Sequence, residues 1–205
     1  MPPPLYSDDR RQLLLLARAA LIELILHDRL PEPPALAGRL IERSGAFVTL
    51  YCRGRLRGCV GMSSGNLPLS ETVVQAAVSA ARDDPRFAAV TREELPEVEI
   101  EISVLSDPQP GPAGAVEVGR HGLLVIRGRK RGLLLPQVAV ERSWPVQRFL
   151  EETCRKAGLP ADAWRDPETQ LLVFTAEVFS EREFPAAMMG GCETRSPSAT
   201  PEPEE

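Results

Sequence analysis

Apolar and polar residues alternate along several short stretches of this chain. In residues 97–105 the apolar side chains from Val98 to Val104 alternate with glutamates and a serine. Residues two apart on a strand share a face, so this run predicts a strand with one face on a core, as in an antiparallel sheet. Residues 45–51 and 56–61 are separated by a short turn and predict a hairpin. The same pattern predicts a second hairpin and a last strand at 122–126, 132–135 and 170–180.

Apolar residues at helical spacing mark three other segments. Leu14, Ala17 and Leu21 recur on one face of residues 13–26, and Ser7 is the predicted N-cap of this helix. Because charged residues interrupt the run and no small-residue cleavage site follows it, we expect neither a membrane span nor a signal peptide. The other two helices are predicted at 68–84 and 143–157.

Length and composition fit a globular protein of the α+β class. The chain has 205 residues, of which 43% are hydrophobic and 26% charged, enough for one compact domain. The irregular order of helices and hairpins favours α+β over a doubly wound parallel sheet. The net charge of -5 argues against a dedicated nucleic-acid binder. Residues 186–205 are rich in proline, serine, threonine and glutamate and are predicted to be a disordered tail that follows a domain at 1–185.

The cysteines do not form a recognisable metal-binding pattern. Their spacing is too irregular for a zinc site, and the sequence has no pair of cysteines separated by two residues. We therefore expect no metal, no cofactor and, because so few cysteines occur in a chain of this length, reduced thiols in a cytoplasmic protein. These cysteines are Cys52, Cys59, Cys154 and Cys192.

The run 56–61 combines residues that ordinary strand packing does not require. If the strand alternates regularly, Arg55, Arg57 and Cys59 point one way. A cation on the same face as a thiol can favour the thiolate. Gly58 and Gly61 leave room for a bulge or for the close approach of another group.

Together with other segments, this run resembles the AMMECR domain, which is known in bacteria as AmmeMemoRadiSam system protein A. The glycine–cysteine run is similar to the family signature, with isoleucine more usual where Val60 stands. The resemblance implies a two-lobed α+β domain on a mainly antiparallel sheet, with a cleft between the lobes. In bacteria it also implies two partners, a Memo-like protein and a radical-SAM protein. The segments that carry it are 45–50, 56–61, 84–87, 99–105, 119–123, 132–139 and 149–157.

The candidate chemistry centres on Cys59. In an enzyme, Cys59 is the nucleophile, Arg57 its electrostatic support and His121 a proton carrier. Glu101 shares a strand face with Glu99, where the two carboxylates act as acid and base or form a solvated face. The structural alternative makes Cys59 a small buried side chain and His121 a hydrogen-bonded structural residue.

Three functions remain open from the sequence. The first is an accessory component of a Memo/radical-SAM modification system, in which the strand bearing Arg57 and Cys59 lines a cleft for a substrate or partner, with Gly58, Gly61, Arg55 and Glu101 contributing to binding. The second is a protein-interaction module that uses the same cleft without turnover. The third is anion or nucleic-acid binding through two basic turns, formed by Arg53, Arg55 and Arg57 and by Arg127, Arg129, Lys130 and Arg131.

Overall fold

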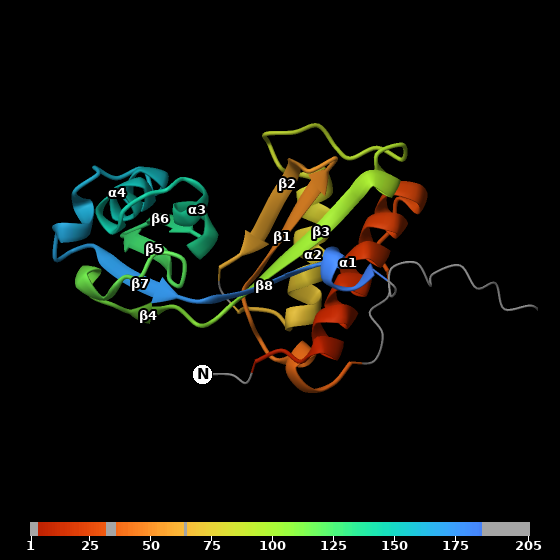
Figure 1. The fold of residues 1–205 in the computed structure, drawn as a ribbon, viewed down its shortest axis with the longest axis horizontal. Coiled ribbons are helices and arrows are strands. Elements are labelled where there is room, and N and C mark those ends of the chain that lie inside the picture. Colours follow the sequence, from red (N-terminus) through yellow and green to blue (C-terminus); the bar gives the residue numbers. More distant parts are fainter. Residues whose placement is uncertain (1–3, 32–35, 64, 186–205) are drawn as a thin grey trace, which may run out of the picture.

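The computed structural model describes residues 4–31, 36–63 and 65–185, which form two lobes side by side (Figure 1). Each lobe has a four-stranded antiparallel sheet with its own helices. The predicted α+β class and the two-lobed arrangement are confirmed. The strands form two separate sheets, however, where the resemblance implied one. The predicted tail at 186–205 lies outside the described residues.

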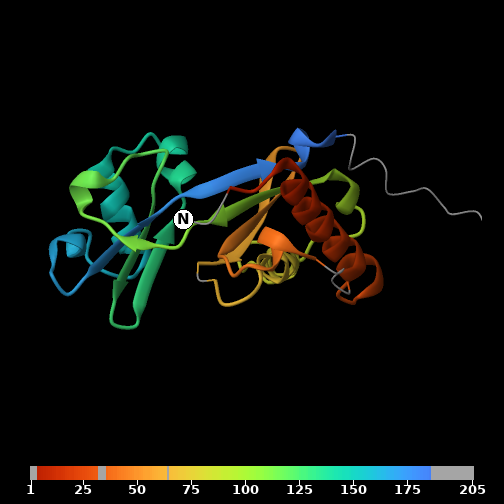
Figure 2. The ribbon, with the colours of Figure 1, turned by 90° about the horizontal axis from the view of Figure 1, so that it is seen from below.

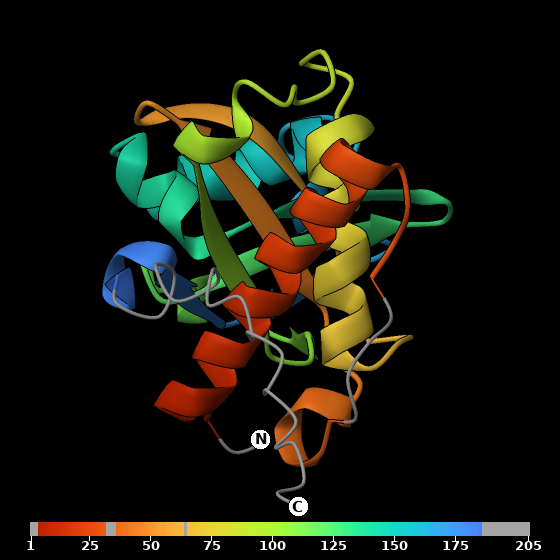
Figure 3. The same cartoon turned by 90° about the vertical axis from the view of Figure 1, so that its right-hand side faces the viewer.

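The first lobe is a sheet with strand order β2-β1-β3-β8 whose one face is covered by α1 and α2, side by side (Figure 3). Alternate strand residues, among them Val48, Leu50, Ile100 and Ile102, are fully buried beneath these helices. The alternation in the sequence therefore separates a helix-covered face from an open one. The elements are α1 (Ser7–His27), β1 (Ala46–Cys52), β2 (Arg55–Met62), α2 (Leu69–Arg82), β3 (Val98–Leu105) and β8 (Ala176–Ser180).

The predicted first helix starts earlier than its apolar stripe. Tyr6, not Ser7, is the N-cap, and its backbone N donates a hydrogen bond of 3.0 Å to the Asp9 carboxylate. Ser7 is the first helical residue. A carboxylate in the first turn also complements the positive end of the helix, so Asp9 has two reasons to stabilise this start.

The second lobe has strand order β4-β7-β5-β6, and its helices pack against that sheet. Its core is small and contains Leu123, Phe149, Leu150 and Cys154, all 2% exposed or less. Cys154 is thus a core residue. The elements are β4 (Gln109–Pro110), β5 (Gly122–Arg127), β6 (Lys130–Leu134), α3 (Pro136–Glu141), α4 (Val146–Lys156) and β7 (Gln170–Phe174).

Two extended segments join the lobes. The predicted single strand at 170–180 is in fact two strands, β7 and β8, which lie in different sheets and are separated by Thr175 (Figure 2). Thr175 pairs with Ser106 of the other crossing segment: Ser106 N donates to Thr175 O and Thr175 N donates to Ser106 Oγ, each at 2.9 Å. These bonds fix the two crossings to each other, so the connection has two hydrogen-bonded chains.

An apolar cluster lies between the lobes and is called the seam below. Leu105 of β3 and Phe47 of β1 contribute from the first lobe, and Leu124, Leu135 and Phe174 from the second. All except Phe47 are less than 9% exposed. The seam therefore removes apolar surface of both lobes from water and holds the lobes against each other.

Gly58 confirms the prediction of a close approach within 56–61. A Cβ built on Gly58 would lie 2.1 Å from the carbonyl oxygen of Ala80 in α2. The missing side chain is therefore what allows α2 to pack on β2. Because the obstructing atom belongs to a helix backbone, no rotation of a side chain can relieve the clash.

We predict that Gly58→Ala destabilises the protein by about 2 kcal/mol or more, the cost of overpacking a closely fitted contact. Gly114→Ala is the matched control, because a Cβ there meets no atom within 4 Å. Thermal unfolding of both variants measures the difference. Equal melting temperatures would show that α2 does not rest on Gly58.

Candidate functional site

The open face of the first sheet carries a row of polar side chains around Cys59. Thr49 on β1 lies opposite Cys59 on β2 and opposite Glu101 on β3, and Glu101 lies opposite Ser180 on β8. Thr49 is buried, and its hydroxyl Oγ1 lies 3.4 Å from the Cys59 Sγ. Four strands therefore present a thiol, two hydroxyls and a carboxylate on one line across the sheet.

The second lobe faces this row through its helices. One hydrogen bond joins the two lobes here: Gln137 Nε2 of α3 donates to Ser103 Oγ of β3 at 3.3 Å. Glu141, at the end of α3, acts electrostatically on Glu101, and Lys156, at the end of α4, interacts with Cys59. We call this surface the interlobe face; it consists of Thr49, Tyr51, Cys59 and Glu101 from the first lobe with Glu141 and Lys156 from the second.

The backbone of Cys59 is held from the free edge of β2. Cys59 N donates to Asp84 Oδ2 at 2.8 Å, and Arg86 Nη2 donates to Cys59 O at 3.3 Å. Arg86 also binds both carboxylate oxygens of Asp84, at 2.9 and 2.7 Å. A strand edge normally presents unpaired donors and acceptors, and here the 84–87 segment satisfies them at Cys59.

Asp84 is the anchor of this arrangement. Its residue is 4% exposed, and the hydrogen bond from the Arg86 guanidinium, with those from backbone N–H groups, holds the pKa of Asp84 well below its ordinary value. The carboxylate therefore stays ionised. The sequence showed the 84–87 segment only as part of the family resemblance, because its contact with β2 depends on how the loop after α2 folds back.

The expected alignment of Arg57 with Cys59 is wrong. A β-bulge between Leu50 and Tyr51 shifts the register, so that Leu50 pairs with Gly58 and Tyr51 with Leu56, and Arg57 has no partner in the ladder. An extra residue in one strand breaks the simple alternation of faces on which the prediction depended. Leu56, not Arg57, lies opposite Tyr51 of the interlobe face.

Arg57 instead fixes the loop that follows α2. Its Nε and Nη2 bind the two carboxylate oxygens of Glu94 at 2.7 and 2.9 Å, and its Nη1 donates to Ala88 O at 2.7 Å. The same Glu94 carboxylate accepts the backbone N–H of Thr91, as expected for a capping residue. Arg57 therefore acts on loop structure, and Arg86 takes the place beside Cys59 that the sequence assigned to Arg57.

Three residues proposed for binding do not present side chains to the interlobe face. Gly58 faces α2, and the space beside Gly61 is filled by Phe47, whose ring would lie 2.6 Å from an added Cβ. Arg55 is exposed at the hairpin, opposite Cys52. Glu101, the fourth residue proposed for binding, does lie in the row with Cys59.

Burial and like charge perturb the ionisation of the row. Desolvation first, and then the neighbouring charge of Glu141, raises the pKa of Glu101 above its ordinary value. Desolvation and the carboxylate of Glu101 raise the pKa of Tyr51 to about 12, so its hydroxyl stays protonated and able to donate. Perturbed groups gathered in one place are typical of functional sites.

Lys156 is the cation of the interlobe face. Its side chain is reached by solvent, yet desolvation by the surrounding protein lowers its pKa, and the charge of Arg86 lowers it further. The Cys59 thiolate acts in the opposite direction and favours the ammonium.

His121 is not brought to Cys59. It lines a cavity at the crossing segments, together with Arg120, and Cys59 is not among the residues of that cavity. The His121 Nδ1 accepts a hydrogen bond of 3.0 Å from the backbone N of Glu117. The proposed role of His121 as proton carrier for Cys59 therefore has no support from the geometry.

No three histidine, cysteine, aspartate or glutamate residues among those that the structure describes converge as a metal site would require. No described helix combines the length and apolar character needed to cross a bilayer.

The fold and the site define a two-lobed α+β domain in which the Cys59 thiol lies on the open face of the first sheet, on the side of the second lobe. The AMMECR1 family model matches residues 14–179, and the chain belongs to this family.

The relatives compared with this chain are archaeal. A protein of Methanothermobacter thermautotrophicus is 45% identical over 186 residues, 87% of this chain and 97% of its own. A protein of Thermococcus kodakarensis is 46% identical over 185 residues, 84% of this chain and 90% of its own. The crystal structure of an uncharacterized Pyrococcus horikoshii protein superposes with a TM-score of 0.81 at 41% identity, covering 86% of this chain and 93% of that one. These relatives support the family and the fold, but not the bacterial subgroup.

We predict that Glu101→Gln raises the melting temperature at neutral pH. The raised pKa means that the folded protein disfavours the ionised carboxylate, a cost that disappears once the pH falls below the ordinary value of 4.5 and the group is neutral in both states. The gain from Glu101→Gln must therefore vanish in acid. Glu99→Gln is the control, because it removes an ion pair with Arg182 and should give no gain.

We predict that Asp84→Asn destabilises the protein by about 1.5–3 kcal/mol, the range for hydrogen bonds to a charged group. The lowered pKa of Asp84 makes its contribution complete above the ordinary value of 3.8 and lost as the pH falls further. Denaturation at neutral and acid pH should show the difference between wild type and variant shrinking in acid. The exposed neighbour Asp83 supplies the control, since Asp83→Asn should cost no more than about 0.5 kcal/mol.

Proposed function

We propose that this protein binds a polar substrate, or a segment of a partner protein, on the interlobe face, with the Cys59 thiol as its reactive or anchoring group. The observation that carries the proposal is the row that joins Cys59, Thr49 and Glu101 on one face of the sheet, with the backbone of Cys59 held by Asp84 and Arg86. Lys156 of the second lobe adds a positive charge on the same side. Packing alone does not require a lysine beside a half-buried thiol. A site assembled from two lobes is also the usual place for a small-molecule pocket.

The charges of the interlobe face favour a ligand with an anionic group. Arg86 and Lys156 lie at the Cys59 end, and Glu101 and Glu141 lie at the other, with the protonated Tyr51 between them. An anionic group placed toward Lys156 and Arg86 avoids the carboxylates. The sequence predicted Arg57 as the cation beside Cys59; in this proposal Arg86 and Lys156 take that role.

Such a site fits an accessory component of a Memo/radical-SAM modification system. This part of the proposal depends on the company that the family keeps in bacteria, a Memo-like protein and a radical-SAM protein. The three described cysteines are free thiols, which suits a reducing cytoplasm. The ligand on the interlobe face is then a substrate passed between these proteins or a segment of one of them.

The third function considered from the sequence gains little support. The two basic turns belong to different lobes, and one or more arginines of each turn have carboxylate partners: Arg53 pairs with Glu97, and Arg127 with Asp166 at 2.9 Å and with Glu168. A continuous basic patch, which nucleic-acid binding needs, does not result from them.

We predict that iodoacetamide labels Cys59 faster than Cys52, because Cys59 is the proposed reactive group of the interlobe face and the positive charges of Lys156 and Arg86 act on it. Lys156→Met should slow the labelling of Cys59 by about two- to fivefold, the effect of losing a charge interaction of about 0.5–1 kcal/mol. Mass spectrometry of the labelled peptides gives both rates in one sample. Adding the purified Memo-like or radical-SAM protein should protect Cys59 and not Cys52.

Arg57→Met is the matched control for the labelling. It removes an arginine of the same strand that binds Glu94 and the loop carbonyls and whose charge acts on Cys52, so the rate at Cys59 should equal that at Cys59 in the wild type. If Cys59 reacts more slowly than Cys52 at every pH, the thiol is inert and the reactive role is wrong. Equal slowing by Lys156→Met and Arg57→Met would show that the effect is not local to the interlobe face.

A further inference from the structure

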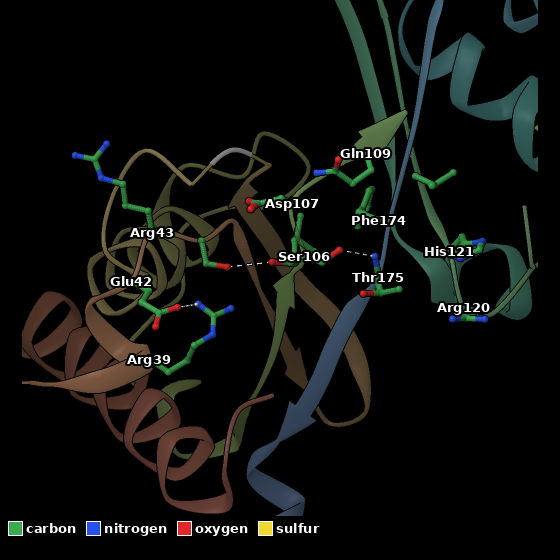
Figure 4. Close-up of a pocket in the computed structure, with 13 residues that line it drawn as sticks. Arg39, Glu42, Arg43, Ser106, Asp107, Gln109, Arg120, His121, Phe174 and Thr175 are labelled. Carbon is green, nitrogen blue, oxygen red and sulfur yellow. Dashed lines mark hydrogen bonds and ion pairs between the residues drawn. The ribbon is translucent and has the colours of Figure 1, made fainter. Parts of the chain in front are cut away.

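The cavity that contains His121 is a second polar site between the lobes (Figure 4). It has a volume of about 690 Å³, within the range of small-molecule sites. The crossing residues Ser106 and Thr175 line it, and Leu105 and Phe174 of the seam add apolar surface. The cavity is thus built where the two lobes are joined.

Arg39 is an enclosed cation on the wall formed by the first lobe. Its side chain is only 7% exposed. Its one ion pair is a contact of 3.2 Å from Nη1 to Glu42, itself 49% exposed, and its Nε has no hydrogen-bond partner within the described part of the chain. An enclosed guanidinium with an unmet donor is costly unless another acceptor reaches it. Arg39 therefore places a guanidinium with a single carboxylate partner, among the described residues, at the wall of the cavity.

The opposite wall adds two more donors. Arg120 and His121 come from the second lobe and lie across the cavity from Arg39 (Figure 4). Because the Nδ1 of His121 accepts the backbone N–H of Glu117, its Nε2 carries the proton of the neutral ring and can donate. Arg120 is 66% exposed on its side chain, and its carboxylate partner Glu117 is not part of the cavity lining.

Positive groups outnumber negative ones around this cavity, in a protein whose net charge is -5. Three arginines, Arg39, Arg43 and Arg120, line it against two carboxylates, those of Glu42 and Asp107, and His121 adds a hydrogen-bond donor. An excess of one charge in a concave site raises the local concentration of ligands of opposite charge. The excess of cations here selects anions.

We propose that this cavity binds a small organic anion, a phosphate ester or a carboxylate, whose charged group lies between Arg39 of the first lobe and Arg120 and His121 of the second. A guanidinium offers parallel donors that match either anion. The apolar part of the ligand rests on Leu105 and Phe174. The site is separate from the interlobe face and bridges the two lobes.

Isothermal titration of the full chain with phenyl phosphate, phenylacetate and inorganic phosphate tests this site, with benzyl alcohol as the neutral analogue. We expect one of the two phenyl anions to bind with a Kd of about 1 mM or tighter, benzyl alcohol not to bind, and inorganic phosphate to bind more weakly. The stronger of the two phenyl anions identifies the ester or the carboxylate. Arg39→Met and Arg120→Met should each weaken binding about tenfold, as for the loss of one charge-assisted hydrogen bond.

Matched variants separate this site from others. Arg82→Met removes an exposed arginine outside the cavity, and Cys59→Ser alters the interlobe face; both should leave the affinity unchanged. Arg120→Met also guards against misfolding, because its exposed side chain can be removed without opening a core. No binding of either phenyl anion at about 10 mM, binding of benzyl alcohol as strong as theirs, or undiminished binding by Arg120→Met would overturn the proposal.

Discussion

The two lobes are held together by the packing of Phe47 and Phe174 in the seam, and each ring has its place because the residue paired with it across the sheet is a glycine. Gly61 lies opposite Phe47, and Gly122 opposite Phe174. A Cβ on either glycine would lie 2.6 Å or less from the ring of its partner. Aromatic rings over cross-strand glycines are a known way to fill such gaps. The join therefore depends on two residues without side chains.

The seam also separates the two polar sites of the protein. On β1, Thr49 follows Phe47 on the same face, so the row with Cys59 begins one step along the strand from the seam. On the other strands of the join, Leu105 and Phe174 of the seam also line the cavity that holds His121. The seam thus borders both the interlobe face and the cavity that contains His121. The seam therefore lies between His121 and the row with Cys59.

How well the sequence predicted the structure depended on whether the pattern was local. The alternation in 97–105 predicted β3 and its buried face, because each residue's environment follows from its neighbours on the strand. The bulge beside Leu50 could not be seen in this way, and one extra residue was enough to send Arg57 to the loop of Glu94. The split at Thr175 was hidden for a related reason: an extended chain that passes from one sheet to another keeps the composition of a strand.

The partners of Cys59 were missed because they come from distant elements. Arg86 follows α2 and Lys156 ends α4, and only the folded chain brings their charges to one thiol. The sequence did contain one usable sign, the 84–87 segment. An acidic and a basic residue there, close to the end of a helix that packs on β2, could have been considered as caps for the strand edge.

The run 56–61 is mainly architectural, and this sharpens the role of its cysteine. Gly58 admits α2, Val60 packs into the first core, Gly61 admits Phe47, and Arg57 fixes a loop. Cys59 alone combines a backbone bonded on both its N–H and its C=O with a side chain directed to the other lobe. A group whose backbone is immobilised while its side chain stays available is preorganised for binding or reaction. The surrounding residues of the run are best understood as the means by which one thiol is held in that position.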